Sequence, residues 1–168
     1  QAVVLVNGMR DVLKAADPAH AAGYDARAAE YAGKLQKLKA DGRELLKDKK
    51  DKKLVTFHES LTYFADTFGL EIVDVIQKTP GKEPTAKELD KLVETCVKGK
   101  VRVIAVEPQY TTQTSAARVK QELEARGLAD VRLVEIDPLE TANPGEVTPD
   151  WYEAKTRANV RALADALK

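Results

Sequence analysis

Four short runs of apolar and β-branched residues stand out in the chain after residue 53. They occupy residues 54–57, 71–76, 101–106 and 131–136. The third run, VRVIAV, is almost continuously apolar, which is typical of a strand that is covered on both faces of its sheet. The pattern therefore predicts four β-strands.

Helical patterns of apolar residues separate these strands and follow the last one. Three of them are expected to end at glycines, Gly69, Gly99 and Gly127, because glycine readily stops a helix. One opens with Thr85 and Glu88 at the spacing of a capping box. Because strands alternate with helices, we expect right-handed crossovers and a parallel sheet.

The last helical pattern, which ends the sequence, is predicted to open with Thr148 as its N-cap and Pro149 at the first helical position. No strand pattern occurs in the first 47 residues, where two helices are expected instead. The predicted fold class is α/β: a four-stranded parallel sheet flanked by helices and preceded by a helical hairpin.

The second helix of this hairpin is expected to be unusually long. Asp17 and Pro18 suit its N-cap and first position, and the helix would run to about Lys47 unless Gly33 or Gly42 breaks it. At 1.5 Å per residue it would be roughly 45 Å long, whereas a small domain is only about 30 Å across. Such a helix should overhang a four-stranded lobe, which suggests that a partner lobe is missing.

Length and charge restrict the class of protein. The chain has 168 residues, and 27 basic residues balance 27 acidic ones, so nothing in the overall charge attracts nucleic acid or an anionic membrane. No apolar stretch approaches the roughly 20 residues of a membrane span. Cys96 is the only cysteine and is expected to be a small buried apolar residue. Since Gln1 is not a natural start residue, we expect a processed or truncated product.

Polar residues follow three of the four predicted strands. His58 follows the first strand, Glu107 the third and Asp137 the fourth. In an open parallel sheet, ligands bind outside the carboxyl ends of the strands. A histidine and a carboxylate at that edge suit a divalent transition metal. The alternatives are a capping or core role for His58, and a turn opened by Asp137 before Pro138.

An enzymatic interpretation is the alternative from another class of protein. The turn after the first strand, HESL, is not a glycine-rich phosphate loop, and the chain has no GxSxG elbow. A small α/β hydrolase or phosphatase-like enzyme could still use His58 and Asp137. It would need a nucleophile at the same edge, for which Ser60 and Thr111 are the nearby hydroxyls.

A set of motifs in order along the chain resembles a known family. They are DPAHAAGYDARAAEYAGKLQKL, FHESLTYFADTFGL, GKEPTAKELDKLV, VEPQY, IDPL and VTPDWYEAKTRANVRALADALK. Together they are similar to the periplasmic zinc- and manganese-binding receptors of ABC transporters. The resemblance implies two α/β lobes joined by a long rigid helix, with the metal in the cleft between them. It also implies that His58 and Asp137 are the ligands of the second lobe, and that Glu107 is a supporting group near the cleft.

By this resemblance, residues 1–50 would be a helical segment with the linking helix, and residues 51–168 the C-terminal lobe. The N-terminal lobe, with its two usual histidines, would be missing. The chain would then bind Zn²⁺, or less favourably Mn²⁺, only weakly, and self-association would be one way to cover its unpartnered surface. The implied protein is no enzyme. It is a periplasmic or cell-surface receptor, lipid-anchored at full length, that hands its metal to a membrane permease.

Overall fold

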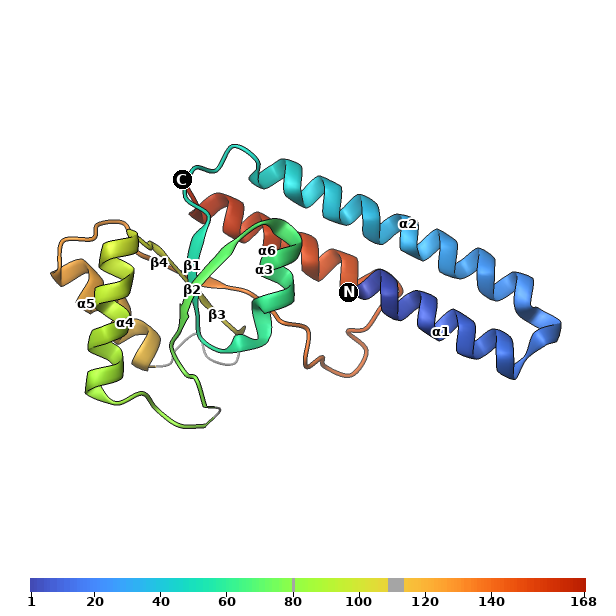
Figure 1. Cartoon of the computed structure of the whole chain (residues 1–168), viewed down its shortest axis with the longest axis horizontal. Coiled ribbons are helices and arrows are strands. Elements are labelled where there is room, and N and C mark those ends of the chain that lie inside the picture. Colours follow the sequence, from blue (N-terminus) through green and yellow to red (C-terminus); the bar gives the residue numbers. More distant parts are fainter. Residues whose placement is uncertain (80, 109–113) are drawn as a thin grey trace. The chain divides into compact units, whose positions relative to one another are not determined.

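The computed structural model describes residues 1–79, 81–108 and 114–168 of the chain (Figure 1). These residues form two compact units, Gln1–Glu44 and Leu45–Lys168, which are described separately below. The predicted division between residues 50 and 51 falls shortly after this boundary, and its assignment to a linking segment and a lobe stays a prediction. Within the described ranges, no helix combines the length and the apolar character needed to cross a bilayer.

The first unit is a helical hairpin. Helix α1 spans Ala2–Ala16, a 3₁₀ turn η1 spans Pro18–His20, and helix α2 spans Ala21–Leu46, of which the part up to Glu44 belongs to this unit. With 26 residues, α2 is about 39 Å long, and it continues through Gly33 and Gly42, which were considered as possible breaks. The predicted long helix is therefore present.

Polar contacts near the turn hold this hairpin together. The ammonium of Lys14 in α1 lies 2.6 Å from a carboxylate oxygen of Asp25 in α2. At the turn, the carboxylate of Asp17 accepts a hydrogen bond from the Tyr24 hydroxyl at 2.9 Å and contacts Nδ1 of His20 at 2.7 Å. The side chain of His20 thus contacts Asp17 within the turn of the first unit.

The second unit contains one four-stranded parallel sheet, as predicted. Its strands are β1 (Lys53–Thr56), β2 (Glu71–Val75), β3 (Val103–Val106) and β4 (Arg132–Glu135). They are ordered β2-β1-β3-β4, and every neighbouring pair is parallel. The central strands, β1 and β3, are also the most buried, as expected for strands that are covered on both faces.

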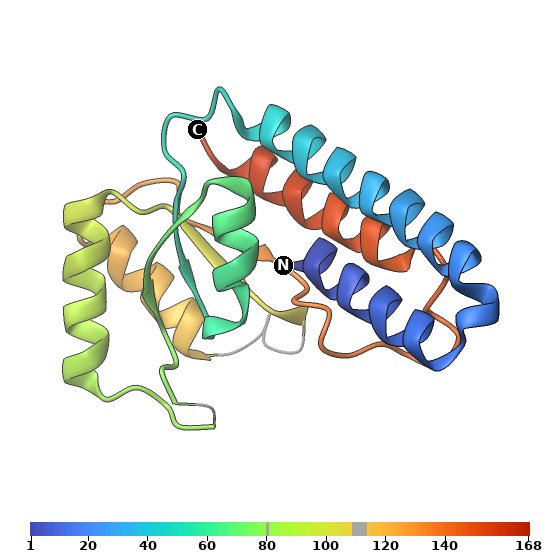
Figure 2. The ribbon, with the colours of Figure 1, turned by 45° about the vertical axis from the view of Figure 1, so that its right-hand side comes forward.

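Helices cover the two faces of this sheet (Figure 2). They are η2 (Glu59–Leu61), α3 (Thr62–Phe68), α4 (Ala86–Gly99), α5 (Thr114–Ala125) and α6 (Trp151–Ala166). One core joins the sheet to α4 and α5, and a second joins it to α3 and α6. Neighbouring residues of β1 enter opposite cores, Leu54 the second and Val55 the first.

Of the predicted helix ends, those at Gly69 and Thr85 are confirmed, the one at Gly99 lies a residue away, and α5 ends at Ala125, two residues before Gly127. Gly69 ends α3 in the left-handed region with φ 71°, and Thr85 forms a complete capping box with Glu88 at the start of α4. Helix α4 includes Gly99, and its left-handed cap is Lys100, with φ 56°. Val101, the residue after this cap, is buried in the core.

The prediction for the start of the last helix is wrong. Helix α6 begins at Trp151 with Asp150 at the N-cap position, whereas Thr148 was expected there. The carbonyl of Thr148 accepts a hydrogen bond from the Trp151 N–H at 3.0 Å, and its hydroxyl donates to Asp150 at 2.8 Å. Thr148 and Pro149 therefore form a turn ahead of the helix, so the polar threonine bonds locally instead of capping.

Candidate metal site

The register of the sheet brings three polar residues together at its carboxyl edge. Thr56 of β1 pairs with Val75 of β2 and with Ala105 of β3. The residues two positions beyond these partners are His58, Gln77 and Glu107. Because parallel strands all end at the same edge, these side chains have the opportunity to meet outside β1.

They do meet, and the imidazole of His58 is held from both sides. Its Nδ1 lies 2.8 Å from Oε2 of Glu107, and its Nε2 lies 2.7 Å from Oε1 of Gln77. The side chain of His58 is 17% exposed and that of Glu107 only 3%. The ring of Phe57 packs against the imidazole edge to face, with 4.8 Å between centroids. Backbone register, two hydrogen bonds and one aromatic contact thus fix the ring.

The partners of His58 are themselves held in place. Oε1 of Gln77 also accepts the Gly81 N–H at 3.2 Å, and Oε1 of Glu107 accepts the Ser60 hydroxyl at 2.9 Å. The Ser60 hydroxyl therefore donates its hydrogen bond to Glu107 and not to His58. This geometry does not support Ser60 as an activated nucleophile. The other hydroxyl considered for an enzyme, Thr111, lies outside the described residues.

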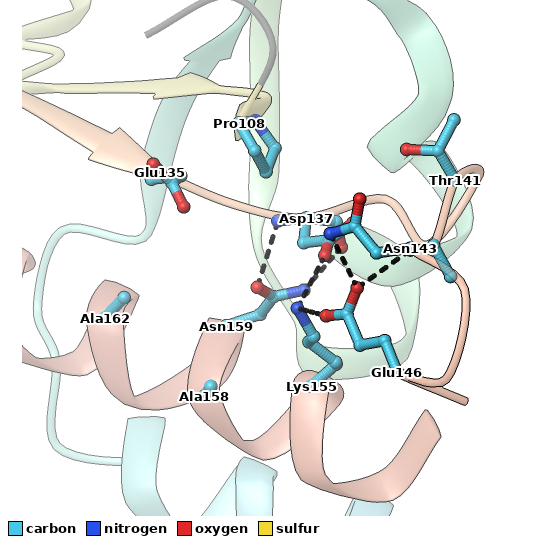
Figure 3. Close-up of a pocket in the computed structure, with 11 residues that line it drawn as sticks. Pro108, Glu135, Asp137, Thr141, Asn143, Glu146, Lys155, Ala158, Asn159 and Ala162 are labelled. Atoms are coloured by element: carbon cyan, nitrogen blue, oxygen red, sulfur yellow. Dashed lines mark hydrogen bonds and ion pairs between the residues drawn. The ribbon is translucent and has the colours of Figure 1, made fainter. Parts of the chain in front are cut away.

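Asp137 leaves the same edge of the sheet after β4, with β3 between it and the strand that carries His58. Its Oδ1 accepts the N–H of Leu139 at 2.8 Å, which supports the left-handed φ of 65° at that leucine. Its backbone N–H and C=O both bond to the side-chain amide of Asn159, at 3.0 and 2.7 Å (Figure 3). Asp137 therefore does open a turn, and this turn occupies only one of its carboxylate oxygens.

The other oxygen of Asp137 faces a charged pair beside a pocket of about 430 Å³. Figure 3 shows Lys155 of α6 pointing toward both Asp137 and Glu146. The Lys155 ammonium lies 3.4 Å from Oδ2 of Asp137 and 2.6 Å from Oε1 of Glu146. The hydrogen bond from Lys155, followed by one from the Asn143 N–H, lowers the pKa of Glu146 to about 2. Glu146, and then Asp137, raise the pKa of Lys155.

Sequence reasoning missed four residues of this edge: Gln77, Glu146, Lys155 and Asn159. Gln77 could have been found by the rule that selected His58, since it closely follows β2. Lys155 and Asn159 are spaced by four positions on α6, so they share one face of the helix. Glu146 carried no signal, because it lies in a loop whose path the sequence pattern does not define.

The chain's other histidine and its cysteine lie elsewhere. His20 is paired with Asp17, and its side chain is 75% exposed. Cys96, on the core-facing side of α4, is fully buried, and burial raises its thiol pKa to about 12. Over the described ranges, no three histidine, cysteine, aspartate or glutamate side chains gather as a metal-binding group. Any metal held at His58 or Asp137 would need further ligands.

The sequence matches the family described as "Zinc-uptake complex component A periplasmic" over residues 1–166. The zinc-binding lipoprotein AdcA of Streptococcus pneumoniae strain R6 is 33% identical over 164 residues, which are 97% of this chain and 31% of AdcA. The zinc-binding protein AdcA of Streptococcus pyogenes serotype M6 is 30% identical over the same length and share of this chain, and 30% of that protein is covered. The chain thus spans about a third of the length of these relatives.

Solved structures agree with the sequence comparison. The solute-binding protein FpvC of Pseudomonas aeruginosa, solved in complex with Mn²⁺, superposes with a TM-score of 0.80 at 25% identity. The superposition covers 98% of this chain and 57% of FpvC. The matches in sequence and in fold extend through nearly the whole chain, including both compact units. This chain therefore belongs to the family of periplasmic component A proteins of zinc-uptake complexes.

Proposed function

We propose that this chain is the C-terminal lobe, with its linking helix, of the substrate-binding component of an ABC-type metal-uptake transporter. The cargo is Zn²⁺, which His58 and Asp137 bind from one side of a cleft. The observation that carries this proposal is the pairing of His58 Nδ1 with the buried carboxylate of Glu107 at the carboxyl edge of the sheet.

That pairing is the arrangement in which histidine is an effective metal ligand. Metal-binding histidines generally donate their second ring N–H to a carboxylate, which fixes the tautomer and makes the other nitrogen more basic. In this chain, Glu107 holds Nδ1 and leaves Nε2 as the ligand atom. The ion takes the place of the proton that Nε2 directs at the Gln77 carbonyl; this proton is released to solvent, and Gln77 keeps its bond to the Gly81 N–H.

Asp137 contributes the second ligand. Its Oδ1 and its backbone are engaged by Leu139 and Asn159, so the side chain is held in one orientation. Its Oδ2 lies 3.4 Å from the ammonium of Lys155, and both residues line the pocket. A carboxylate whose orientation is fixed by the turn that it stabilises can meet an ion without further ordering of the loop.

The ligand pair favours Zn²⁺ over Mn²⁺. Neutral imidazole suits zinc, whereas manganese prefers sets made of carboxylate, carbonyl and water oxygens. Since zinc takes four ligands, two side chains from this lobe leave two positions for other donors. The N-terminal lobe of the complete receptor supplies them, and the chain without it binds zinc weakly.

The complete receptor is a binding protein rather than an enzyme, and it delivers its ion to the membrane permease of the transporter. It works outside the cytoplasm, in the periplasm or on the cell surface, with a lipid anchor in the latter case. Support for an absent lobe comes from helix α1, where several large apolar side chains are exposed: Val4, Leu5, Met9 and Val12. In isolation, copies of this chain cover such surface by self-association.

Zinc titration of four proteins tests the site. Wild type, His58→Ala and Asp137→Asn are compared by competition with a fluorescent zinc chelator. We expect each variant to weaken binding at least tenfold; the amide introduced by Asp137→Asn keeps an oxygen for the Leu139 N–H, so the turn survives. His20→Ala is the matched control, because it removes the chain's other histidine, and it should bind like wild type. Equal affinity in wild type and His58→Ala would contradict the proposal.

A further inference from the structure

The ammonium of Lys155 lies within reach of two carboxylates, and only one of them belongs to the proposed metal site. It is 2.6 Å from Glu146 and 3.4 Å from the Oδ2 of Asp137 that faces the pocket (Figure 3). The side chains of Lys155 and Glu146 are 35% and 30% exposed, and that of Asp137 is 18% exposed. A permanent positive charge therefore sits beside a carboxylate to which the proposed function brings a divalent cation.

We propose that Lys155 is a built-in competitor of the metal: its ammonium lies between Glu146 and Oδ2 of Asp137, and an arriving ion displaces it from Asp137, so that Glu146 alone holds it. This inference rests on the proposed function, because it takes Asp137 as a ligand. It assigns to Lys155 and Glu146 the setting of the metal affinity. Neither residue touches the ion.

Electrostatics give the direction of the effect. Lys155 and a divalent ion carry charges of the same sign, and one carboxylate oxygen cannot hold both at short range in a partly buried site. The ion has twice the charge and bonds the oxygen directly, so it prevails at sufficient concentration. While Lys155 is present, the free energy needed to displace its ammonium from Asp137 reduces the net binding free energy of the ion.

The surroundings of Lys155 make this displacement a short movement. Its contact with Glu146 is already the closer of the two, and the lysine side chain has a flexible four-carbon stem. Glu146 is fixed in turn by the N–H of Asn143 at 3.0 Å. Asp137 stays in place because Leu139 and Asn159 hold it independently of Lys155. Only one contact, that of Lys155 with Asp137, needs to break.

The proposal predicts effects of opposite sign for two substitutions. Lys155→Met keeps the aliphatic stem and removes the charge, so zinc should bind about tenfold more tightly, within the range found for groups that surround metal ligands. Glu146→Gln removes the carboxylate that receives the displaced ammonium, so zinc should bind several-fold more weakly. In the double variant the Glu146→Gln effect should vanish, because no ammonium remains to be received.

Lys120→Met is the matched control. Lys120 lies on α5 and pairs with Glu124 at 2.6 Å, and its side chain is 34% exposed, so the control removes a similar charge in a similar ion pair away from Asp137. Its zinc affinity should equal that of wild type. Thermal unfolding of each variant without metal separates loss of the fold from a change in affinity.

Tighter binding by Lys155→Met, with the double variant matching it, supports the proposal. Unchanged or weaker binding by Lys155→Met, with its unfolding midpoint preserved, overturns it. The two proposals can fail separately. If Asp137→Asn weakens binding but Lys155→Met does not strengthen it, only the competitor role is wrong. If wild type and Asp137→Asn bind zinc equally, both the ligand assignment and the competitor role are wrong.

Discussion

Oε2 of Glu107 lies 2.8 Å from Nδ1 of His58, although the two residues are 49 positions apart in the chain. The contact follows from the pairing of Thr56 with Ala105, because His58 lies two positions after Thr56 and Glu107 lies two positions after Ala105. The central strands of the sheet therefore carry the histidine and its carboxylate on neighbouring backbones. This makes Glu107 the residue whose replacement should best reveal how the imidazole is prepared for a metal.

Glu107→Gln should lower zinc affinity by about 10- to 100-fold, the usual cost of altering the partner of a metal-binding histidine. The amide keeps the size of the side chain but no longer favours a proton on Nδ1. Isothermal titration with zinc measures the effect. The exposed carboxylate of Glu59, the neighbour of His58, provides the control Glu59→Gln. Similar affinities for the two variants would argue against Glu107 as the group that orients the ring.

Glu146 should make the stability of the folded chain decrease at acidic pH. Its pKa lies near 2 in the folded chain, mainly through the hydrogen bond from Lys155, below its ordinary value of 4.5. A lowered pKa means that this contribution to folding is complete above about pH 4.5 and is lost as the pH falls toward 2. The melting temperature of wild type should exceed that of Glu146→Gln at pH 6, and the difference should shrink at pH 3. A constant difference would show that the charge of Glu146 does not contribute.

Thr85 should stabilise the start of α4 through its capping box with Glu88. Thr85→Ala is expected to lower the free energy of unfolding by about 1 kcal/mol, because the Glu88 N–H loses its acceptor. Urea denaturation measures this change. Thr95→Ala on the same helix is the control, since the Thr95 hydroxyl donates only to the carbonyl one turn earlier and replacing it should cost little.

Cys96 should be inert in the folded chain. It is fully buried, and burial, followed by the charge of Asp74, raises its pKa to about 12. At pH 8 almost no thiolate is therefore present, and an aromatic disulfide reagent should label Cys96 only after unfolding in urea. Labelling of the native chain at the rate of the unfolded chain would contradict the burial. Cys96→Ser should destabilise more than Cys96→Ala, because it leaves a buried hydroxyl.

The strands and their parallel arrangement could be predicted because each apolar run matches the length of a buried strand. His58, Glu107 and Asp137 could be selected because residues that directly follow parallel strands all lie at the same edge of the sheet. Their contacts could not be predicted, since these depend on register, and the length of an apolar run does not fix the register of a strand. A shift of one residue in β3 would have turned Glu107 away from His58.

Lys155 and Glu146 show the second limit. Their meeting depends on the path of the chain between β4 and α6, and the start of α6 was itself misplaced in the prediction. Turns such as the one at Thr148 are decided by a few local hydrogen bonds of similar energy. Periodicity therefore indicates which face of α6 carries Lys155, but not which loop residue comes to lie against it.

The order of the strands along the chain also determines at which stage of folding the site is assembled. His58 follows the first strand to be synthesised, whereas its partners follow the second and third, and Asp137 with Lys155 belongs to the last part of the chain. The residues that follow the strands reach one another through parallel pairing, which requires long crossovers and closes late in folding, and Lys155 joins them when α6 packs on the sheet. In a nascent or unfolded chain His58 is therefore separated from Gln77, Glu107 and Asp137, and the metal site proposed above is complete only in molecules that have formed their sheet.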